Sequence, residues 1–416
     1  DVKKCLDPYN IFNPGVLLND DSEIHLKNLK TIPAVNPLID KCIECGFCEK
    51  SCPSKDLTLT PRQRITVYRL LESSEVPNPE LARLFEYSGE ATCATDGLCA
   101  LACPVEINTG ILIKELRFKN KTPGAEKIAE YLSANMDTVT SWGRFVLNVV
   151  HFKHKLLGTS VLGFFAEKAY KWSGKRIPLW NPQMPKGADL PPILSDINTN
   201  GNTKKHTDNN VNKNTVVYFP TCINRTMGNS ADNADKKSLM QASVDLLEKG
   251  GFTVVYPDNL SKLCCGMAYA SKGFRDQAEQ KENELNSELL KVSKNGKYPV
   301  FVDMSPCLHH MKETLDPTLK LYEPVEFIHD FLLDKINFRK KSESITIHNT
   351  CTTIKMGLQD KFLKVAQHLS EEVIVPEKTG CCGWAGDRGF THPELNASAL
   401  KDLKSKIPKH VHEGYS

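Results

Sequence analysis

The sequence predicts a multidomain protein in which an all-α helical domain is followed by two tandem α/β cysteine-rich domains. Two observations lead to this prediction. Two closely similar cysteine motifs stand in the first quarter of the chain without a strand signal between them, and a strand–helix–strand pattern occurs twice in the second half. At 416 residues the chain is too long for one ordinary core and agrees with two to four domains.

Composition narrows the functional class before any motif is considered. The formal net charge of +3 is nearly balanced and gives no argument for a nucleic-acid partner. No uncharged apolar run is long enough for a membrane span, and no secretory leader is visible. The 15 cysteines stand in CxxC and CC patterns, which are poor disulfide frameworks, so we expect metal or thiol chemistry in a reducing, cytoplasmic compartment.

Residues 1–24 form the first segment and residues 36–125 the predicted helical domain. The opening letters, "DVKKCLDPYNIFNPGVLLND", contain Asp-Pro and Asn-Pro-Gly turns around a short apolar stretch. Within the domain, "TPRQRITVYRLLESSE" and "NPELARLFEYSG" each begin with a turn residue and a proline and then repeat apolar residues at helical spacing. Both are therefore predicted helices.

The two cysteine motifs of this domain predict iron–sulfur clusters. The first reads "CIECGFCEKSCP" and the second "CATDGLCALACP". Three thiolates at equal two-residue intervals can wrap the corners of a cluster, and in two-cluster arrangements the fourth cysteine ligates the other cluster. Zinc sites favour two separated CxxC pairs, so zinc is the weaker interpretation. Exchange of the fourth ligand assigns Cys42, Cys45, Cys48 and Cys103 to one cluster, and Cys52, Cys93 and Cys99, with Asp96 as candidate fourth ligand, to the other.

Asp96 stands where the second motif should have its second cysteine, and it admits two interpretations. As an iron ligand, the carboxylate would hold iron less firmly than a thiolate. Alternatively, Asp96 caps a turn in which Gly97 takes a positive φ, and a three-iron cluster remains. The second cluster is therefore expected as 4Fe-4S or 3Fe-4S, with an external ligand as a further choice for the fourth iron.

Residues 126–194 are a predicted helical connector and residues 195–214 a flexible linker. The stretch "SWGRFVLNVVHFKHKLLGTSVLGFFAEKAY" is apolar with basic interruptions. It is either an amphipathic surface that touches a membrane or a quinone pool, or a pair of helices that packs on neighbouring domains. Packing is favoured because apolar helix faces are usually core. The linker "SDINTNGNTKKHTDNNVNKN" is almost free of apolar residues.

The repeat after the linker defines domains 215–340 and 344–416. "VVYFPTC" and "ITIHNTC" are strands that end in Thr-Cys, and each copy continues with a helix, a short strand and a CCG. The cysteines follow strand ends, where α/β folds place their sites. They could hold a further cluster, act as redox thiols or be structural. The second copy is expected to be truncated before its last strand and cysteine. The redox candidates are Cys222, Cys264, Cys265, Cys307, Cys351, Cys381 and Cys382.

Three parts of the chain resemble known families. The opening "KKCLDPYNIFNPGVLL" is similar to the C-terminal end of FAD-linked oxidases of 2-hydroxy acids. The block from Cys42 to Cys103 resembles the α-helical ferredoxin module. Residues 216–416 resemble the tandem CCG domains of heterodisulfide reductase subunits and glycolate oxidase iron–sulfur subunits, although "CLHH" stands where heterodisulfide reductase domains carry CxxC. In this order the parts look like an FAD-linked D-lactate dehydrogenase fused to its iron–sulfur domains.

The resemblance implies a function for the intact protein. FAD, in an oxidase domain that this chain lacks, would oxidise D-lactate, and this chain would pass the electrons to a quinone or cytochrome. The protein would be cytoplasmic or peripheral on the inner face of the cell membrane. Glycolate oxidase, another D-2-hydroxy-acid dehydrogenase and a thiol–disulfide reductase subunit are the alternatives, as is a zinc scaffold in which no electrons move. No residue of this chain is assigned to catalysis or to FAD.

Overall fold

Short helices build the N-terminal part of the computed structural model, which describes residues 2–16, 18–27, 29, 32–174, 177, 179–190, 214–230, 233, 236–340 and 342–416. No strand occurs in these ranges before Pro185. The predicted linker 195–214 lies outside the described residues except for its last position. The helical segments are α1 (Val2–Leu6), η1 (Ile24–Leu26), η2 (Phe47–Ser51), α2 (Pro61–Ser73), α3 (Pro79–Phe85), η3 (Glu86–Ala91), α4 (Leu98–Leu101), α5 (Thr109–Lys119), α6 (Pro123–Ala134) and α7 (Met136–Trp172).

Side-chain caps fix where α2, α3 and α6 begin. Thr60 accepts a hydrogen bond from the backbone of Gln63, and the Gln63 side chain accepts one from the backbone of Thr60, so α2 begins with a reciprocal capping box followed by Pro61. Asn78 and Thr122 cap α3 and α6 by accepting a hydrogen bond from the backbone of Leu81 and Ala125, without the reciprocal bond, and each stands before a proline. The turn residue and proline seen in the sequence are therefore the start signals of these helices.

Replacing Thr60 with alanine should lower the free energy of unfolding by about 1 kcal/mol, because the first turn of α2 loses its side-chain acceptor. Chemical denaturation followed by helical circular dichroism measures the loss. Thr66→Ala on the same helix is the control, since the Thr66 hydroxyl donates only to the Arg62 carbonyl one turn earlier. If both variants lose the same stability, the cap is not the cause.

The first α/β unit is a parallel sheet in the order β4-β2-β5-β6. Its central strands are fully buried and carry the core side chains Val217, Tyr218, Phe219, Phe301 and Val302. A short antiparallel ribbon of β1 and β3 lies outside this sheet. The elements are β1 (Pro185–Gly187), β2 (Thr215–Phe219), α9 (Cys222–Thr226), β3 (Met227–Ser230), α10 (Leu239–Lys249), β4 (Thr253–Val255), η5 (Leu260–Lys262), α11 (Met267–Lys272), α12 (Arg275–Ser293), β5 (Val300–Val302), α13 (Ser305–Thr314), β6 (Leu321–Tyr322), α14 (Pro324–Phe327) and η6 (Ile328–Leu332).

The second unit repeats this arrangement with the parallel order β8-β7-β9. β7 takes the place of β2, and β9 pairs with β7 as β5 pairs with β2. The last strand, which the sequence suggested was missing from this repeat, is therefore present as β9. The elements are β7 (Ser342–Ile347), α15 (Cys351–Lys355), α16 (Gln359–Leu369), β8 (Ser370–Ile374), α17 (Arg388–Thr391), α18 (Pro393–Leu400), η7 (Lys404–Lys406) and β9 (Glu413–Tyr415).

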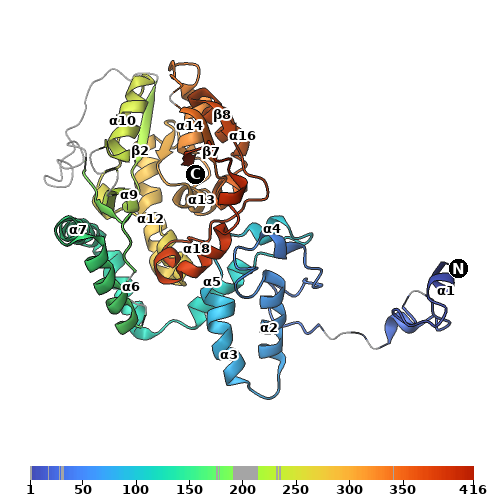
Figure 1. Ribbon diagram of the computed structural model, residues 1–416. Helices are drawn as coiled ribbons and strands as arrows, with labels where there is room; N and C mark the ends of the chain where they lie inside the picture. Colours follow the sequence, from blue (N-terminus) through green and yellow to red (C-terminus); the bar gives the residue numbers. More distant parts are fainter. Residues whose placement is uncertain are drawn as a thin grey trace.

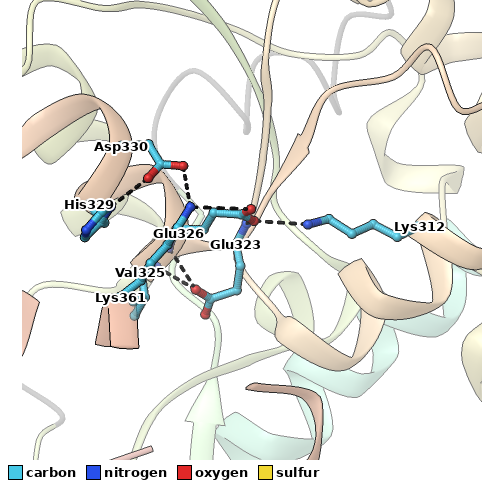
Figure 2. Close-up of polar contacts among 7 residues, drawn as sticks. All are labelled: Lys312, Glu323, Val325, Glu326, His329, Asp330 and Lys361. Atoms are coloured by element: carbon cyan, nitrogen blue, oxygen red, sulfur yellow. Dashed lines mark hydrogen bonds and ion pairs between the residues drawn. The ribbon is translucent and has the colours of Figure 1, made fainter. Parts of the chain in front are cut away.

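A network of charged side chains joins the two units. Lys361 of α16 reaches Asp330 at 2.6 Å and Glu326 at 3.9 Å in the first unit, and Lys312 lies 3.0 Å from Glu326 (Figure 2). His329 also contacts Asp330, at 2.7 Å. Partly exposed pairs of this kind add little stability one by one, but together they fix how α16 lies on the first unit.

The predicted fold class is wrong in one respect: the N-terminal helices do not form a separate all-α domain, and the molecule is mixed α/β with a helical N-terminal region. Ala94 and Leu98 of that region complete an apolar cluster with Cys381 and Leu395 of the second unit. Tyr87 donates a hydrogen bond to Glu394 of α18, and Figure 1 shows the N-terminal helices α2 to α5 and this helix as parts of one continuous body. The two helices predicted in this region, α2 and α3, begin after the turn residues that the sequence shows, but their region shares its apolar surface with the second unit.

Candidate functional site

The first cysteine motif forms a loop around a small apolar cavity. Gly46 has a φ of +84°, which allows the chain to turn between Cys45 and Cys48, and η2 begins directly after it. The buried guanidinium of Arg69 donates hydrogen bonds to the carbonyl oxygens of Ile39, Asp40 and Cys42, which fixes the entry to the loop. The motif is therefore held from both ends.

Four cysteines from both motifs line this cavity: Cys42, Cys45, Cys48 and Cys103. The cavity has a volume of about 50 Å³ and is partly open to solvent, and apolar side chains such as Ile65 and Ile107 complete its wall. Burial raises the pKa of the Cys48 thiol to about 11. A thiol of that kind becomes a thiolate only with a positive partner, and iron supplies one. These residues are the set assigned to the first cluster on sequence, and their donor chemistry fits an iron–sulfur cluster.

The second group of cysteines surrounds a buried arginine. Arg64 donates from Nη1 to the Cys52 sulfur at 3.5 Å, from Nη2 to Ser54 at 2.8 Å and from Nε to the Gly89 carbonyl at 2.7 Å. Although burial alone would lower the pKa of Arg64, the nearby Cys93 and Cys52 thiolates raise it. A permanent cation beside three thiols favours their anionic form, which is the form that binds iron. Arg64 gave no signal in the sequence beyond its place in a helix.

Asp96 caps the turn at Gly97, as one of the two interpretations of the sequence expects, and it also lies near the second α/β unit. Its Oδ1 accepts a hydrogen bond from the Leu98 backbone at 2.7 Å, and Gly97 has a φ of +78°. Burial raises the pKa of the Asp96 carboxyl, and the nearby Cys381 thiol of the second α/β unit partly offsets this rise. The side chain therefore lies between the motif loop and a CCG cysteine.

The four cysteines of the first repeat converge. Cys222 begins α9 directly after β2, and its sulfur lies 3.7 Å from the sulfur of Cys264. Cys265 follows Cys264 directly, and both Cys264 and Cys307, which lies on α13 after β5, act on the pKa of its thiol. The hydrogen bond with Cys264 and burial raise the pKa of Cys222 well above the usual thiol value. Strand ends and the CCG loop thus bring these side chains to one site.

Two buried charges that the sequence did not single out hold this site in place. Arg225 donates to the carbonyl oxygens of Pro220, Leu260 and Leu263, and so ties the Cys222 turn to the segment before Cys264. Asp303 accepts from the Tyr218 hydroxyl at 2.8 Å and from the Thr221 backbone at 2.9 Å. Only the position of Asp303, four residues before Cys307, could have suggested a role.

Three cysteines of the second repeat form the corresponding group. Cys351 begins α15, which Thr350 caps, and Cys381 accepts a hydrogen bond from the Gly383 backbone at 3.4 Å. A hydrogen bond with Cys381 lowers the pKa of Cys351, and another lowers the pKa of Cys382 to about 6. Cys382 is therefore the thiol of this group that is readily deprotonated near neutral pH, whereas hydrogen bonds with Cys351 and Cys382 raise the pKa of Cys381 well above the usual thiol value.

The four-cysteine cavity is the place where the first motif could hold a cluster of several atoms. In the ranges that the structure describes, no three His, Cys, Asp or Glu side chains are arranged around one metal ion. An iron–sulfur cluster occupies the space between its cysteines, and the four-cysteine cavity offers such a space. The residues that would hold the two clusters are those of the two groups described above.

Comparison with known proteins identifies two kinds of domain. A model of the 4Fe-4S dicluster domain matches residues 38–107, and a model of the cysteine-rich domain matches residues 216–312 and 345–410. These matches confirm the resemblance to ferredoxin-type and CCG domains. No solved structure matches the chain significantly.

Three relatives are similar to different extents. Lactate utilization protein A of Oceanobacillus iheyensis is 25% identical over 183 residues, 40% of this chain and 72% of the relative. The probable glycolate oxidase iron-sulfur subunit of Bacillus subtilis is 22% identical and aligns with 88% of this chain and 82% of its own length. A dihydromethanophenazine:CoB–CoM heterodisulfide reductase component from Methanosarcina acetivorans is 25% identical, over 92% of this chain and 86% of the relative.

Proposed function

Because the chain contains a 4Fe-4S dicluster domain and two cysteine-rich domains, we propose that it is the iron–sulfur electron-transfer part of an FAD-dependent D-lactate dehydrogenase. The observation that carries the proposal is the cavity in which Cys103 of the second motif joins Cys42, Cys45 and Cys48 of the first. Two clusters that exchange their fourth ligands lie close together, which suits them to pass single electrons.

The residues of the chain have separate tasks in this function. The two cysteine groups hold the clusters, which when bound accept and release one electron at a time. Arg64 places a positive charge beside Cys52, and the apolar wall of the first cavity limits access of water to its cysteines. Arg225 and Asp303 hold the first CCG group, which would receive electrons and pass them to a quinone or cytochrome.

The choice of D-lactate rests on two similarities. The opening residues resemble the end of FAD-linked 2-hydroxy-acid oxidases, and two relatives carry lactate utilization and glycolate oxidase in their names. Glycolate is therefore the second substrate to test. The low pKa of Cys382 favours a third candidate, a thiol–disulfide function of the second CCG group.

Electron transfer from a flavoprotein tests the proposal. The anaerobically purified chain, reconstituted with iron and sulfide, is mixed with an FAD-linked D-lactate dehydrogenase, and bleaching of the cluster absorption is followed after addition of D-lactate or glycolate. Rapid bleaching with D-lactate supports the proposal. If the clusters bleach only with glycolate and a glycolate-oxidising flavoprotein, the substrate of the intact enzyme is glycolate and not D-lactate. Changes in free thiols without bleaching would favour the thiol–disulfide function.

The long helix α7 provides the proposed contact with the membrane. It bends at Gly158, and Asn148 and Arg144 attach its first half to the β1 ribbon and to the Arg225 carbonyl. On its free side, Phe152 is 66% exposed and Leu156 72% exposed, and Trp172 at its end is 88% exposed. Packing on neighbouring domains therefore accounts for one side of α7 only. It does not explain why these large apolar side chains remain exposed.

Basic side chains lie on the same helix as these exposed apolar residues, and this combination favours binding to an anionic lipid surface. Lys153, Lys155, Lys168 and Lys171 lie on α7, and lysine favours the headgroup level of an anionic bilayer. No helix in the described part of the chain is long and apolar enough to cross a membrane. We therefore expect α7 to lie in the membrane interface.

The double variant Phe152→Glu and Leu156→Glu should reduce binding of the chain to vesicles of phosphatidylglycerol and phosphatidylcholine at least about tenfold, because two charges would enter the apolar layer. Co-sedimentation measures the bound fraction. Val76→Glu, which changes an apolar side chain of similar exposure away from α7, is the control. Unchanged binding of the double variant, or no binding of the unmodified chain, contradicts the membrane contact.

A further inference from the structure

The loop between Cys93 and Cys99 belongs to the ferredoxin-type region but packs on the second CCG group. Ala94 and Leu98 share one apolar cluster with Cys381, and Cys351 packs against the same cluster. A Cβ at Gly380 would lie 3.8 Å from Leu98. The loop is therefore part of the wall around these cysteines.

Two hydrogen bonds and an ion pair also join the helical region near this loop to the second α/β unit. Arg388 donates from Nε to the Ala91 carbonyl at 2.9 Å, two residues before Cys93. Tyr87 donates to Glu394 at 2.9 Å, and Lys401 pairs with Asp56 at 3.1 Å. The position of the loop on the second unit is thus fixed by contacts other than those of Asp96.

Asp96 is the one acidic side chain of this loop, and it stands between Ala94 and Leu98, which pack against Cys381. Burial raises the pKa of its carboxyl, and the Cys381 thiol partly offsets this rise, which agrees with a place beside the cysteines of the second unit. Lys355, at the end of α15, lies beside the loop: its Nζ would be 3.4 Å from a Cβ at Gly97. The lysine balances the charge that the carboxylate brings into a buried place.

The first CCG group has different surroundings. Cys264 and Cys222 belong to an apolar cluster with Ala129 of α6 and Met136 of α7, and the Tyr269 hydroxyl contacts the Met136 sulfur at 3.3 Å. Among the residues that the structure describes, that cluster includes none from the Cys93–Cys99 loop. The loop therefore packs on the cysteines of the second repeat and does not take part in the apolar cluster around those of the first.

We propose that Asp96 is a member of the second CCG site, where it adds a carboxylate donor to the thiols of Cys351, Cys381 and Cys382. In the described chain the second repeat contributes three cysteines to its site and the first repeat four. A carboxylate is a harder donor than a thiolate and is suited to an iron with an exchangeable position. The inference rests on the proposed iron–sulfur function, and it removes Asp96 from the ligands of the second ferredoxin-type cluster.

This assignment makes the Cys93–Cys99 loop a direct link between two redox sites. Cys93 and Cys99 hold the second cluster on one side of the loop, and Asp96 reaches the second CCG site on the other. The second CCG site is then the neighbour to which that cluster passes electrons.

Asp96→Asn is the variant that tests the proposal, because asparagine keeps the acceptor for the Leu98 backbone and removes only the carboxylate charge. The full chain is reconstituted anaerobically with iron and sulfide. Iodoacetamide then labels the cysteines that iron does not protect, and mass spectrometry of the peptides reads each cysteine separately. Labelling of Cys351, Cys381 and Cys382 should become about ten- to a hundredfold faster in the variant, while labelling of Cys52, Cys93 and Cys99 stays unchanged.

Asp56→Asn is the matched control, since Asp56 also joins the helical region to the second unit but contacts Lys401 and no cysteine. Faster labelling of Cys93 and Cys99 in Asp96→Asn would return Asp96 to the second ferredoxin-type cluster. Unchanged labelling of every cysteine would reduce Asp96 to a turn residue. Both results overturn the proposal. Failure of the proposed function gives a different result, namely full labelling of all cysteines in the unmodified chain.

Discussion

Replacing Cys103 with serine should remove the cluster of the first motif, although Cys103 belongs to the second. Cys103 lines the same cavity as Cys42, Cys45 and Cys48, and serine oxygen is a poor replacement for thiolate at iron. We expect the reconstituted variant to lose roughly half of the iron bound by the two motifs. Iron and acid-labile sulfide analysis with electron paramagnetic resonance of the reduced chain measures the loss.

Cys5→Ser is the control for this variant, because Cys5 is exposed on α1 and lies outside every motif. Its iron content should equal that of the unmodified chain. If Cys103→Ser instead destroys the signal of the cluster at Cys93 and Cys99 and leaves the other intact, each motif binds its own cluster without exchange.

Replacing Arg225 with methionine should lower the free energy of unfolding by at least about 2 kcal/mol. Methionine leaves the carbonyl oxygens of Pro220 and Leu263 buried without their donor, at a cost of about 1–3 kcal/mol each, whereas the Leu260 carbonyl keeps the Leu263 N–H. The same change frees the Cys222 turn from the segment before Cys264. Denaturant unfolding of the metal-free chain measures the stability.

Arg339→Met, at an exposed position of the same α/β unit, is the control and should change stability by less than about 0.5 kcal/mol. Thiol cross-linking gives a second reading for Arg225→Met. Cys222 and Cys264, 3.7 Å apart in the native chain, should form a disulfide more slowly under mild oxidation. An Arg225→Met chain with native stability would show that the three carbonyl bonds do not hold the site.

Local spacing was enough to predict the donors of the first cluster as a group, but this remains a prediction until iron is measured. Two-residue intervals place Cys42, Cys45 and Cys48 on one loop whatever surrounds it, and the repeated strand–helix–strand order implies parallel sheets. The separate all-α domain was wrong for a physical reason. The sequence shows an apolar residue at position 98, but it does not show that Leu98 packs against Leu395, nearly three hundred positions later.

The same reason explains the residues that sequence reasoning missed. Arg64, Arg225 and Asp303 act through buried hydrogen bonds to backbone and side chains that are distant in the sequence. The turn at Asp96 was foreseen from the following glycine, whereas its contact with Cys381 depends on how two units pack. Likewise, the pattern of α7 is amphipathic, but only the structure shows that Phe152 and Leu156 remain exposed.

Determination of iron, zinc and acid-labile sulfide in the anaerobically purified chain decides whether the motif cysteines hold iron–sulfur clusters. We expect iron and sulfide in near-equal amounts with little zinc. Zinc bound without acid-labile sulfide would contradict this expectation and would leave a scaffold that moves no electrons.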